Sequence, residues 1–393
     1  MKTRIGVFFG GMSVEHEIAV ISAVQAMAAL DRGKYDVIPV YITKKGQLFT
    51  GEKLLDIEAF KNIPALLSAC RQVTVVKEGK DAVLLDVKGG IGRRRPVAVM
   101  DLAFPIVHGT NCEDGSIAGF FELLGIPYVG CDVLSAALGM DKAVCKQVLA
   151  AAGIPVLPCV SFTAREWVED RDALRARIGE EIGYPAIVKP ANLGSSVGIV
   201  KVKTEEELFS GVEESLAYAD KVLVERAVTS LREINCSVVG DADECEASVC
   251  EEPVMSDEIL SYADKYLSGG GKSKGMSSLK RRIPAEIPPE TEARITDYAR
   301  RAFKALSCNG VVRIDFMLDG DNDNQVLVNE VNTIPGSLSF YLWEPKGVPY
   351  SALLDRLVEL AFKRKRSREN LSFDFDTNIL ASGGALGAKG VKK

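Results

Sequence analysis

The sequence predicts an α/β protein built from three consecutive units, and three observations support this interpretation. Short apolar strands alternate with amphipathic helices over residues 1–130, a pattern typical of a parallel sheet covered by helices. From about residue 131 the chain changes to a smaller α+β pattern, which extends to residue 228. A last strand-rich unit is expected at 229–375, followed by a Gly-rich, basic tail at 376–393 that we expect to be flexible.

The first unit places two polar loops directly after strands. The expected elements are, in order, a strand at 4–10, a helix at 15–30, strands at 35–43 and 97–109, and a helix at 116–125. The loops GGMSVEHE and HGTNCEDG contain Glu15 and His108. Ligands of parallel sheets bind beyond the carboxyl ends of the strands. We therefore expect both loops at the binding edge, although acids such as Glu15 are also favoured simply because they begin a helix.

The second and third units are expected to contain antiparallel pairs. The expected elements are a helix at 135–153, a strand at 154–162, a charged helix, two strands within 184–202 joined by a Gly/Ser turn, and strands at 219–228 and 233–240. They continue with a helix at 289–306 and strands at 310–320 and 325–333. The acidic turn DGDNDN between the last two strands predicts a hairpin.

Composition excludes several classes of function. The net charge of −6 gives no electrostatic reason to expect a nucleic-acid partner. Nine cysteines without a CxxC pair, and only two histidines, favour reduced core thiols in a cytoplasmic protein over disulfides or a structural zinc site. The chain begins with an apolar strand rather than a signal sequence, and no apolar run approaches the length that spans a membrane.

The hairpin at 310–333 is a candidate magnesium site. Because side chains alternate along a strand, Arg313 and Asp315 share one face, and Glu330 and Asn332 share one face of the next strand. Mg²⁺ takes hard oxygen ligands and usually shares them with phosphates. The alternative is a solvated hairpin face. A calcium loop of the EF-hand type is not expected, because Asn324 stands where the required glycine would be and the flanks are strands.

Two lysines are candidates to bind an anion, and the acid Glu225 stands where a hinge could bracket a nucleotide base. Lys189 ends a strand just before the turn NLGSSVG, whose glycines let backbone amides approach a phosphate. Lys142 lies within the expected helix at 135–153, and Glu225 lies at the edge of an apolar strand. Each signal alone is weak, since a lone lysine is more often a surface charge. The stretch GGGKS is not a P-loop, because Tyr266 stands where that pattern requires glycine.

Together these segments resemble a known family. The motifs are GGMSVEHEI, HGTNCEDGSIAGFFELLGIPYVG, MDKAVCK, IVKPANLGSSVGI, DKYLSGG, RIDFML and NEVNTIPGS, in the order and approximate spacing of the D-alanine–D-alanine ligases. The resemblance covers about residues 3–365. It implies a pre-ATP-grasp domain followed by a two-lobed ATP-grasp fold, with a lid loop at 256–282. It also implies a homodimer that joins two D-alanines at the expense of ATP, through an acyl phosphate, for peptidoglycan synthesis.

The resemblance assigns roles residue by residue. The residues implied to act in catalysis are Glu15, Ser195, Tyr266, Arg313 and Gly336. Those implied to contact ATP are Lys142, Lys189, Glu225, Glu233, Lys265 and Met317. Those implied to bind Mg²⁺ or Mn²⁺, as two ions, are Asp315, Glu330 and Asn332. Those implied to bind the amino-acid substrates are His108, Ser337 and Tyr341.

Departures from the family pattern leave the second substrate open. Tyr341 stands where a serine is common, Asn111 and Cys112 replace two glycines, and Ala19 replaces a serine. The alternative is a D-alanine–D-serine ligase of the vancomycin-resistance type, since one added hydroxyl is a small steric change. A D-lactate ligase is not expected, because Tyr266 stands where such enzymes carry a histidine.

Two other classes remain as alternatives at this stage. Another ATP-grasp ligase would share the lysines and the metal-binding acids but should lack the motifs GGMSVEHEI and HGTNCEDG, both of which are present. A non-catalytic nucleotide-binding module would bind ATP without turnover dependent on D-alanine.

Overall fold

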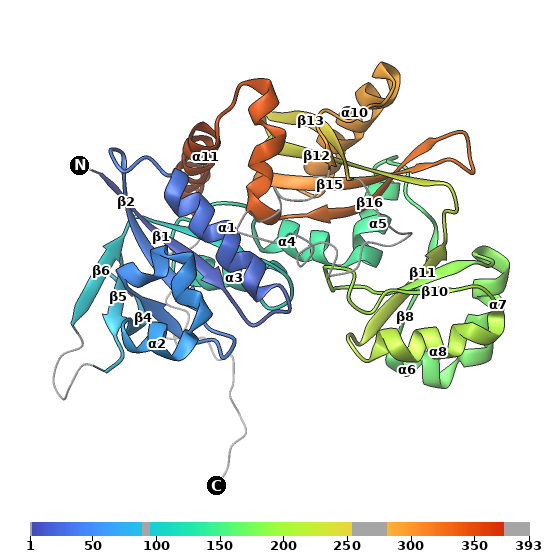
Figure 1. The fold of residues 1–393 in the computed structure, drawn as a ribbon, viewed down its shortest axis with the longest axis horizontal. Coiled ribbons are helices and arrows are strands. Elements are labelled where there is room, and N and C mark those ends of the chain that lie inside the picture. The colour runs from blue at the N-terminus through green and yellow to red at the C-terminus, as the bar shows by residue number, and fades with distance from the viewer. Residues whose placement is uncertain (1, 89–94, 254–280, 373–393) are drawn as a thin grey trace, which may run out of the picture.

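The computed structural model describes residues 2–88, 95–253 and 281–372, and three β-sheets organise them (Figure 1). The sheets follow one another along the chain, and the strands of each come from one of the three expected units. The α/β class is confirmed. The boundaries at 130 and 228 stay predictions, and the expected tail and most of the expected lid lie outside the described residues.

The N-terminal unit is a seven-stranded sheet in the order β6-β5-β4-β3-β2-β1-β7. Its strands are β1 (Thr3–Gly10), β2 (Tyr35–Ile42), β3 (Leu48–Thr50), β4 (Arg71–Glu78), β5 (Asp81–Asp86), β6 (Pro96–Met100) and β7 (Leu102–Val107). Its helical segments are α1 (His16–Ala29), η1 (Glu52–Leu55), η2 (Ile57–Lys61), α2 (Ile63–Ser68) and α3 (Ser116–Leu123).

This sheet is mixed rather than wholly parallel. Strand β1 pairs in parallel with β2 and β7, as the sequence predicts, but β2 through β6 form successive antiparallel pairs. The expected strand at 97–109 is two strands, separated at Asp101, whose carboxylate accepts hydrogen bonds from the backbone and side chain of Arg4. The site-bearing loops nevertheless follow β1 and β7, which are neighbours, so they meet at one edge.

The central unit is a four-stranded antiparallel sheet in the order β10-β9-β11-β8. Helices α4 (Val133–Met140) and α5 (Lys142–Ala151) precede it. Its elements are β8 (Cys159–Thr163), α6 (Ala164–Glu169), α7 (Arg171–Glu181), β9 (Ala186–Pro190), β10 (Val200–Val202), α8 (Glu205–Leu216) and β11 (Lys221–Arg226). The predicted pair within 184–202 is confirmed, because β9 and β10 flank the Gly/Ser turn.

The C-terminal unit is a five-stranded antiparallel sheet in the order β14-β13-β12-β15-β16. Its elements are β12 (Leu231–Gly240), β13 (Cys245–Pro253), β14 (Arg281–Arg282), α10 (Pro289–Ala305), β15 (Gly310–Asp319), β16 (Gln325–Asn332), η4 (Gly336–Leu342), η5 (Glu344–Lys346) and α11 (Tyr350–Glu369). The predicted hairpin is confirmed as β15 and β16. Strand β14 consists of the last two residues of the expected lid loop.

One apolar core joins the first and last elements that the structure describes. Ile5 of β1, Met27 of α1 and Leu357 of α11 belong to the same buried cluster, and Trp343 is fully buried within it. Helix α11 lies beside α1 (Figure 1). This packing fixes the N-terminal unit against the C-terminal sheet. Within the described residues, no helix combines the length and apolar character needed to cross a bilayer.

Candidate active site

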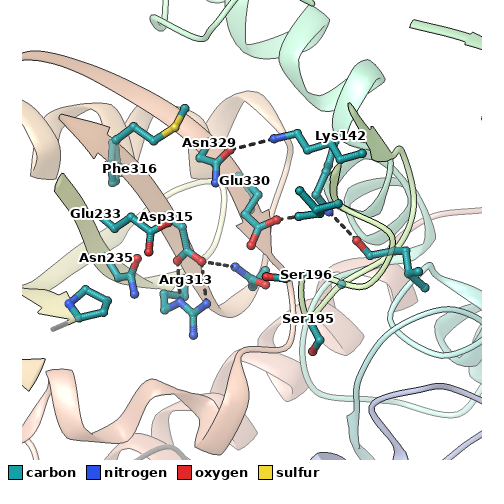
Figure 2. A pocket seen from close by; sticks show the side chains of 18 of the residues that line it. Lys142, Ser195, Ser196, Glu233, Asn235, Arg313, Asp315, Phe316, Asn329 and Glu330 are labelled. Carbon is teal, nitrogen blue, oxygen red and sulfur yellow. Dashed lines mark hydrogen bonds and ion pairs between the residues drawn. The ribbon is translucent and has the colours of Figure 1, made fainter. Parts of the chain in front are cut away.

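A single cavity of about 470 Å³ gathers most of the predicted site residues from all three units. Figure 2 shows its lining residues from the central and C-terminal units. The predicted residues in its walls are Glu15, His108, Lys142, Lys189, Ser195, Glu225, Glu233, Arg313, Asp315, Met317, Glu330, Asn332 and Gly336. Its size and its mixture of apolar and charged walls suit a small-molecule site. The sequence motifs therefore converge in space, although they are spread over more than 300 positions of the chain.

The acidic hairpin forms one wall. Asp315 on β15 is paired in register with Glu330 on β16, and Arg313 with Asn332, as side-chain alternation predicts. Arg313 donates through Nε to Asp315 Oδ1 at 2.6 Å and through Nη2 to Oδ2 at 2.7 Å. The Nδ2 of Asn332 donates to Asp315 Oδ2 at 3.1 Å. Across the sheet, Asn235 of β12 lies opposite Asp315, so a further polar side chain joins this wall.

The donor set of this wall fits a magnesium ion. Two carboxylates and an amide converge there, and hard oxygen ligands of this kind suit Mg²⁺ shared with phosphates. Each carboxylate already faces a cation, since Lys142 Nζ lies 3.3 Å from Glu330 Oε2 and Arg313 pairs with Asp315. The described residues contain no group of three or more His, Cys, Asp or Glu side chains that could hold a metal, and this wall itself offers two carboxylates and one amide.

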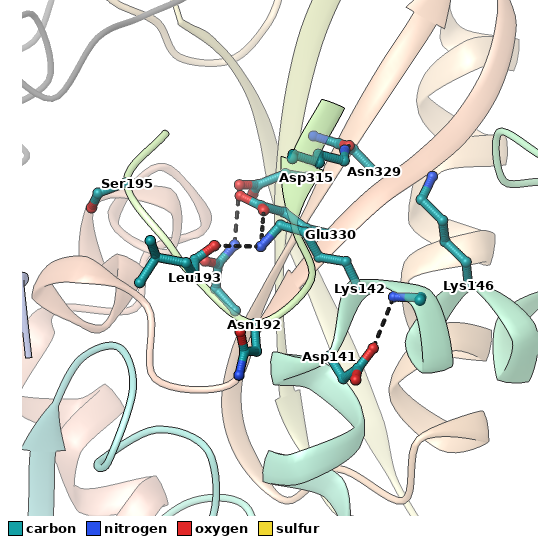
Figure 3. Close-up of polar contacts among 12 residues, drawn as sticks. Asp141, Lys142, Lys146, Asn192, Leu193, Ser195, Asp315, Asn329 and Glu330 are labelled. Atoms are coloured by element: carbon teal, nitrogen blue, oxygen red, sulfur yellow. Dashed lines mark hydrogen bonds and ion pairs between the residues drawn. The ribbon is translucent and has the colours of Figure 1, made fainter. Parts of the chain in front are cut away.

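Lys142 connects two units. It is the first residue of α5, whose N-cap Asp141 accepts hydrogen bonds from the N–H groups of Ala143 and Val144 at 3.0 Å each. Its Nζ donates to the carbonyl oxygen of Leu193 at 2.8 Å, and Figure 3 shows it between that carbonyl and Glu330. The cap aligns the helix start, so that this lysine reaches from the Gly/Ser loop to the acidic hairpin.

Lys189 and Glu225 form a buried ion pair. They lie on the adjacent strands β9 and β11. Leu223 of β11 is opposite Lys189, and Glu225 lies two positions further along β11, so the side chains of Lys189 and Glu225 share one face of the sheet. The Nζ of Lys189 donates to Glu225 Oε1 and, at 3.2 Å, to Asn329 Oδ1. Burial lowers the pKa of Lys189, although Glu225 opposes this effect. This lysine therefore stands at the cavity wall already paired with an acid.

Glu15 reaches the cavity from the loop before α1. Its backbone N–H donates to Ser13 Oγ at 2.9 Å, and its carboxylate accepts a hydrogen bond from Ser195 Oγ. A Cβ at Gly194 would lie 2.6 Å from Glu15 Oε2, so a larger residue there would displace the Glu15 carboxylate from its present position. The N-terminal loop and the Gly/Ser turn of the central unit are thus joined by a side-chain contact across the cavity.

His108 and Glu113 hold the segment that leads to Gly336. Glu113 Oε1 accepts from the N–H of Ile334 at 2.8 Å, and His108 Nδ1 lies 2.8 Å from the Ile334 carbonyl oxygen. Burial lowers the pKa of His108 to about 4, so the ring is neutral at pH 7 and donates from Nδ1. Its Nε2 then accepts from Ser22 Oγ at 3.1 Å.

The pKa of the Glu113 carboxyl group lies well above its ordinary value. Burial, and then the nearby charge of Glu15, raise the pKa of Glu113 to about 7, against the opposing effect of its hydrogen bonds from Ile334 and Gly109. Two acids with different environments therefore share this side of the cavity. The motif HGTNCEDG contained both His108 and Glu113, but only their contact with Ile334, more than 200 residues away, shows what they position.

Two predicted substrate residues stand behind the cavity wall rather than in it. The hydroxyl of Ser337 donates to Gln25 Oε1 at 2.7 Å, and Tyr341 is hydrogen-bonded to Glu251 Oε1 at 3.2 Å. The guanidinium carbon of Arg281 lies 4.3 Å from the centre of the Tyr341 ring, and Arg281 itself lines the cavity. Lys265 and Tyr266 lie outside the described residues.

Sequence reasoning missed several residues in or beside this wall. They are Asn235, Glu251, Arg281 and Asn329, which line the cavity, and Lys146, which lies behind it. Asn235 had a usable signal, since it lies two positions after Glu233 on the same strand. Asn329 did not, because the shift in register between Asp315 and Phe316 breaks the simple alternation.

Comparison with known proteins identifies the family. The family model described as "D-ala D-ala ligase N-terminus" matches residues 4–131, and the one described as "D-ala D-ala ligase C-terminus" matches residues 148–359. The chain belongs to the D-alanine–D-alanine ligase family. A curated member of this ligase family from Caldicellulosiruptor bescii is 40% identical over 95% of this chain and 98% of its own. Another, from Thermoanaerobacter sp. strain X514, is 42% identical over 92% of this chain and 96% of its own.

Solved structures of ligases share the whole architecture. The D-alanine-D-alanine ligase from Coxiella burnetii superposes with a TM-score of 0.76 at 32% identity, covering 94% of this chain and 96% of its own. The VanG D-Ala:D-Ser ligase from Enterococcus faecalis does so with a TM-score of 0.76 at 33% identity, covering 92% and 100%. Overall similarity of fold therefore does not distinguish D-alanine from D-serine as second substrate.

Proposed function

We propose that this protein catalyses the ATP-dependent ligation of two D-alanines to D-alanyl-D-alanine. The carboxylate of the first D-alanine takes the γ-phosphoryl group to give D-alanyl phosphate and ADP, and the amine of the second then displaces phosphate. The observation that carries the proposal is the convergence of one acidic hairpin, two lysines and Glu15 in a single cavity of a chain from this ligase family.

The nucleotide is assigned to the side of the cavity between the central and C-terminal sheets. Lys142 and Lys189 would bind its phosphates, and Glu225, Glu233 and Met317 would contact the adenosine. Asp315, Glu330 and Asn332 would hold Mg²⁺ or Mn²⁺, as two ions. A bound divalent ion would supply neutralisation of the negative charge on the β- and γ-phosphates. Lys265, outside the described residues, is proposed to face the phosphates as well.

The amino acids are assigned to the side nearest the N-terminal unit. Glu15 would bind the ammonium group of the first D-alanine, and the contact with Ser195 orients its carboxylate for that purpose. Arg313 and the N–H of Gly336 would donate to the oxyanion of the tetrahedral intermediate. His108 holds the segment before Gly336, and Tyr266 is proposed to act with Ser195.

The second substrate is proposed to be D-alanine, with Ser337 and Tyr341 near its carboxylate. The curated relatives support this choice, because those described above carry the name D-alanine–D-alanine ligase. Tyr341 is engaged with Glu251 and Arg281, so it would act by placing Arg281 rather than by touching the substrate itself. D-serine is therefore the less favoured alternative.

The decisive experiment measures phosphate release from Mg·ATP by the purified protein with D-alanine alone, then with D-serine or D-lactate added. The products are identified by mass spectrometry. Turnover on D-alanine alone, little altered by D-serine, is the expected result. A mixed dipeptide as main product would establish the D-serine alternative, and no release dependent on amino acid would overturn the ligase proposal. Sedimentation of the same sample tests the proposed homodimer.

A further inference from the structure

A buried lysine that the proposed function does not use lies directly behind the cavity wall. Lys146 follows Lys142 by one turn of α5, so the two side chains leave the same face of the helix. Lys142 lines the cavity, whereas Lys146 does not, and the Lys146 side chain is only 3% exposed. An ammonium group removed from water in this way requires a compensating partner nearby.

That partner is Glu225. The Nζ of Lys146 lies 2.8 Å from Glu225 Oε2, and it donates to the carbonyl oxygen of Leu157 at 3.4 Å. The other carboxylate oxygen, Oε1, is engaged by Lys189. One buried carboxylate is therefore held between two lysines, one of which faces the cavity while the other supports the carboxylate from behind.

The charges of this cluster matter for an anionic ligand. Burial alone would raise the pKa of Glu225, but Lys146 and then Lys189 lower it to about 2, so the carboxylate is ionised at neutral pH. With both lysines charged, the three groups carry one net positive charge. With Lys146 removed, Glu225 and Lys189 would form a neutral pair, and the carboxylate would lose the contact that fixes one of its two oxygens.

We propose that Lys146 is a positioning residue for the nucleotide, which acts through Glu225. It holds the Glu225 carboxylate against Lys189, which faces the cavity, without touching the nucleotide itself. This inference rests on the proposed function, because that function places the nucleotide in this cavity. The proposed roles of the two lysines differ, because Lys142 would contact the nucleotide directly, whereas Lys146 would act through Glu225.

A double-mutant cycle tests this role. The affinity for a non-hydrolysable ATP analogue with Mg²⁺ is measured by calorimetry for the wild type, Lys146→Met, Glu225→Gln and the double variant. We expect Lys146→Met to raise Kd about tenfold in the wild-type background and less than about twofold when Glu225 is already Gln. Equal effects in both backgrounds, or a wild-type Kd for Lys146→Met, would overturn the proposal.

Steady-state kinetics separate positioning from general loss of structure. Lys146→Met should raise KM for ATP about tenfold while kcat and KM for D-alanine stay within about threefold, and Lys146→Arg should restore KM for ATP. An equal fall of activity on both substrates would argue against a role in nucleotide binding. The matched control is Lys346→Met, which removes a partly exposed lysine that pairs with Glu246 at 2.7 Å outside the cavity walls. This control should bind the analogue like the wild type.

Two further comparisons keep the result interpretable. If Lys146→Met does not fold, the double variant is compared with Glu225→Gln instead, because the double variant leaves no unpaired acid at this position. A large difference in Kd between these two variants would contradict the proposal. Failure of the wild type to bind the analogue would overturn the proposed function. Wild-type binding that Lys146→Met leaves unchanged would overturn only the role of Lys146.

Discussion

Arg313 and Asp315, two positions apart on β15, form a two-pronged ion pair with N–O distances of 2.6 and 2.7 Å. One of these residues is proposed to stabilise an oxyanion, and the other is proposed to bind a metal ion. The pair therefore couples the proposed metal ligand to the proposed oxyanion donor. The two parallel hydrogen bonds that hold the Asp315 carboxylate also fix the direction of the Arg313 guanidinium.

Replacement of Arg313 should lower the rate of the chemical step. Arg313→Met removes the proposed oxyanion donor, and loss of one such donor typically costs about 10²–10³ in kcat. Arg313→Lys keeps the charge but cannot form both bonds to Asp315, so it should restore only part of kcat. Steady-state kinetics with D-alanine check this prediction. A Lys variant as active as the wild type would show that charge alone suffices.

Replacement of Ser195 should affect D-alanine rather than ATP. Ser195→Ala removes the hydroxyl that donates to the carboxylate of Glu15, and a hydrogen bond to a charged group contributes about 1.5–3 kcal/mol. We expect KM for D-alanine to rise about tenfold or more, with KM for ATP little changed. Ser210→Ala, which removes an exposed hydroxyl on α8 outside the cavity walls, is the matched control. A selective rise in KM for ATP would contradict the assignment of Glu15.

Replacement of Glu330 should weaken the response to magnesium. Glu330→Gln keeps the size of the side chain but removes a charge that faces Lys142, and hard dications prefer charged oxygen ligands. The Mg²⁺ concentration for half-maximal activity should rise about tenfold or more, and chelation should abolish wild-type activity reversibly. Glu213→Gln, on α8 and outside the cavity walls, serves as control. An unchanged Mg²⁺ titration would remove Glu330 from the proposed ligands.

Glu113 should make the folded state less stable as the pH rises. Its pKa is raised from 4.5 to about 7, so between these values the folded state holds a proton that the unfolded state has lost. The stabilising contribution is complete below about pH 4.5 and is lost as the pH approaches about 7, with a total of about 3 kcal/mol as an upper bound. Denaturation of the wild type and Glu113→Gln across this range measures it. The variant should lack this component of the pH dependence, and identical profiles would contradict the prediction.

The sequence predicted some features because their signals are local. Alternation with a period of two placed Arg313 with Asp315, and Glu330 with Asn332, and the acidic turn predicted the hairpin between them. The mixed N-terminal sheet was missed because no element was predicted between residues 44 and 96. Strand β3 has only three residues there, and β4 and β5 carry charged ends that weaken the apolar pattern.

The sequence by itself determined the α/β class, the family resemblance and the types of side chain in the site. Only the tertiary structure decided which side chains meet. Three contacts join positions from different units or elements. They are the hydrogen bond from Ile334 to Glu113, the hydrogen bond from Ser195 to Glu15, and the buried ion pair of Lys146 with Glu225. No local period encodes such contacts, since they depend on how the sheets pack against one another. The same packing removes water from Glu113 and Glu225, and that loss of solvent, together with the neighbouring charges, sets their pKa values.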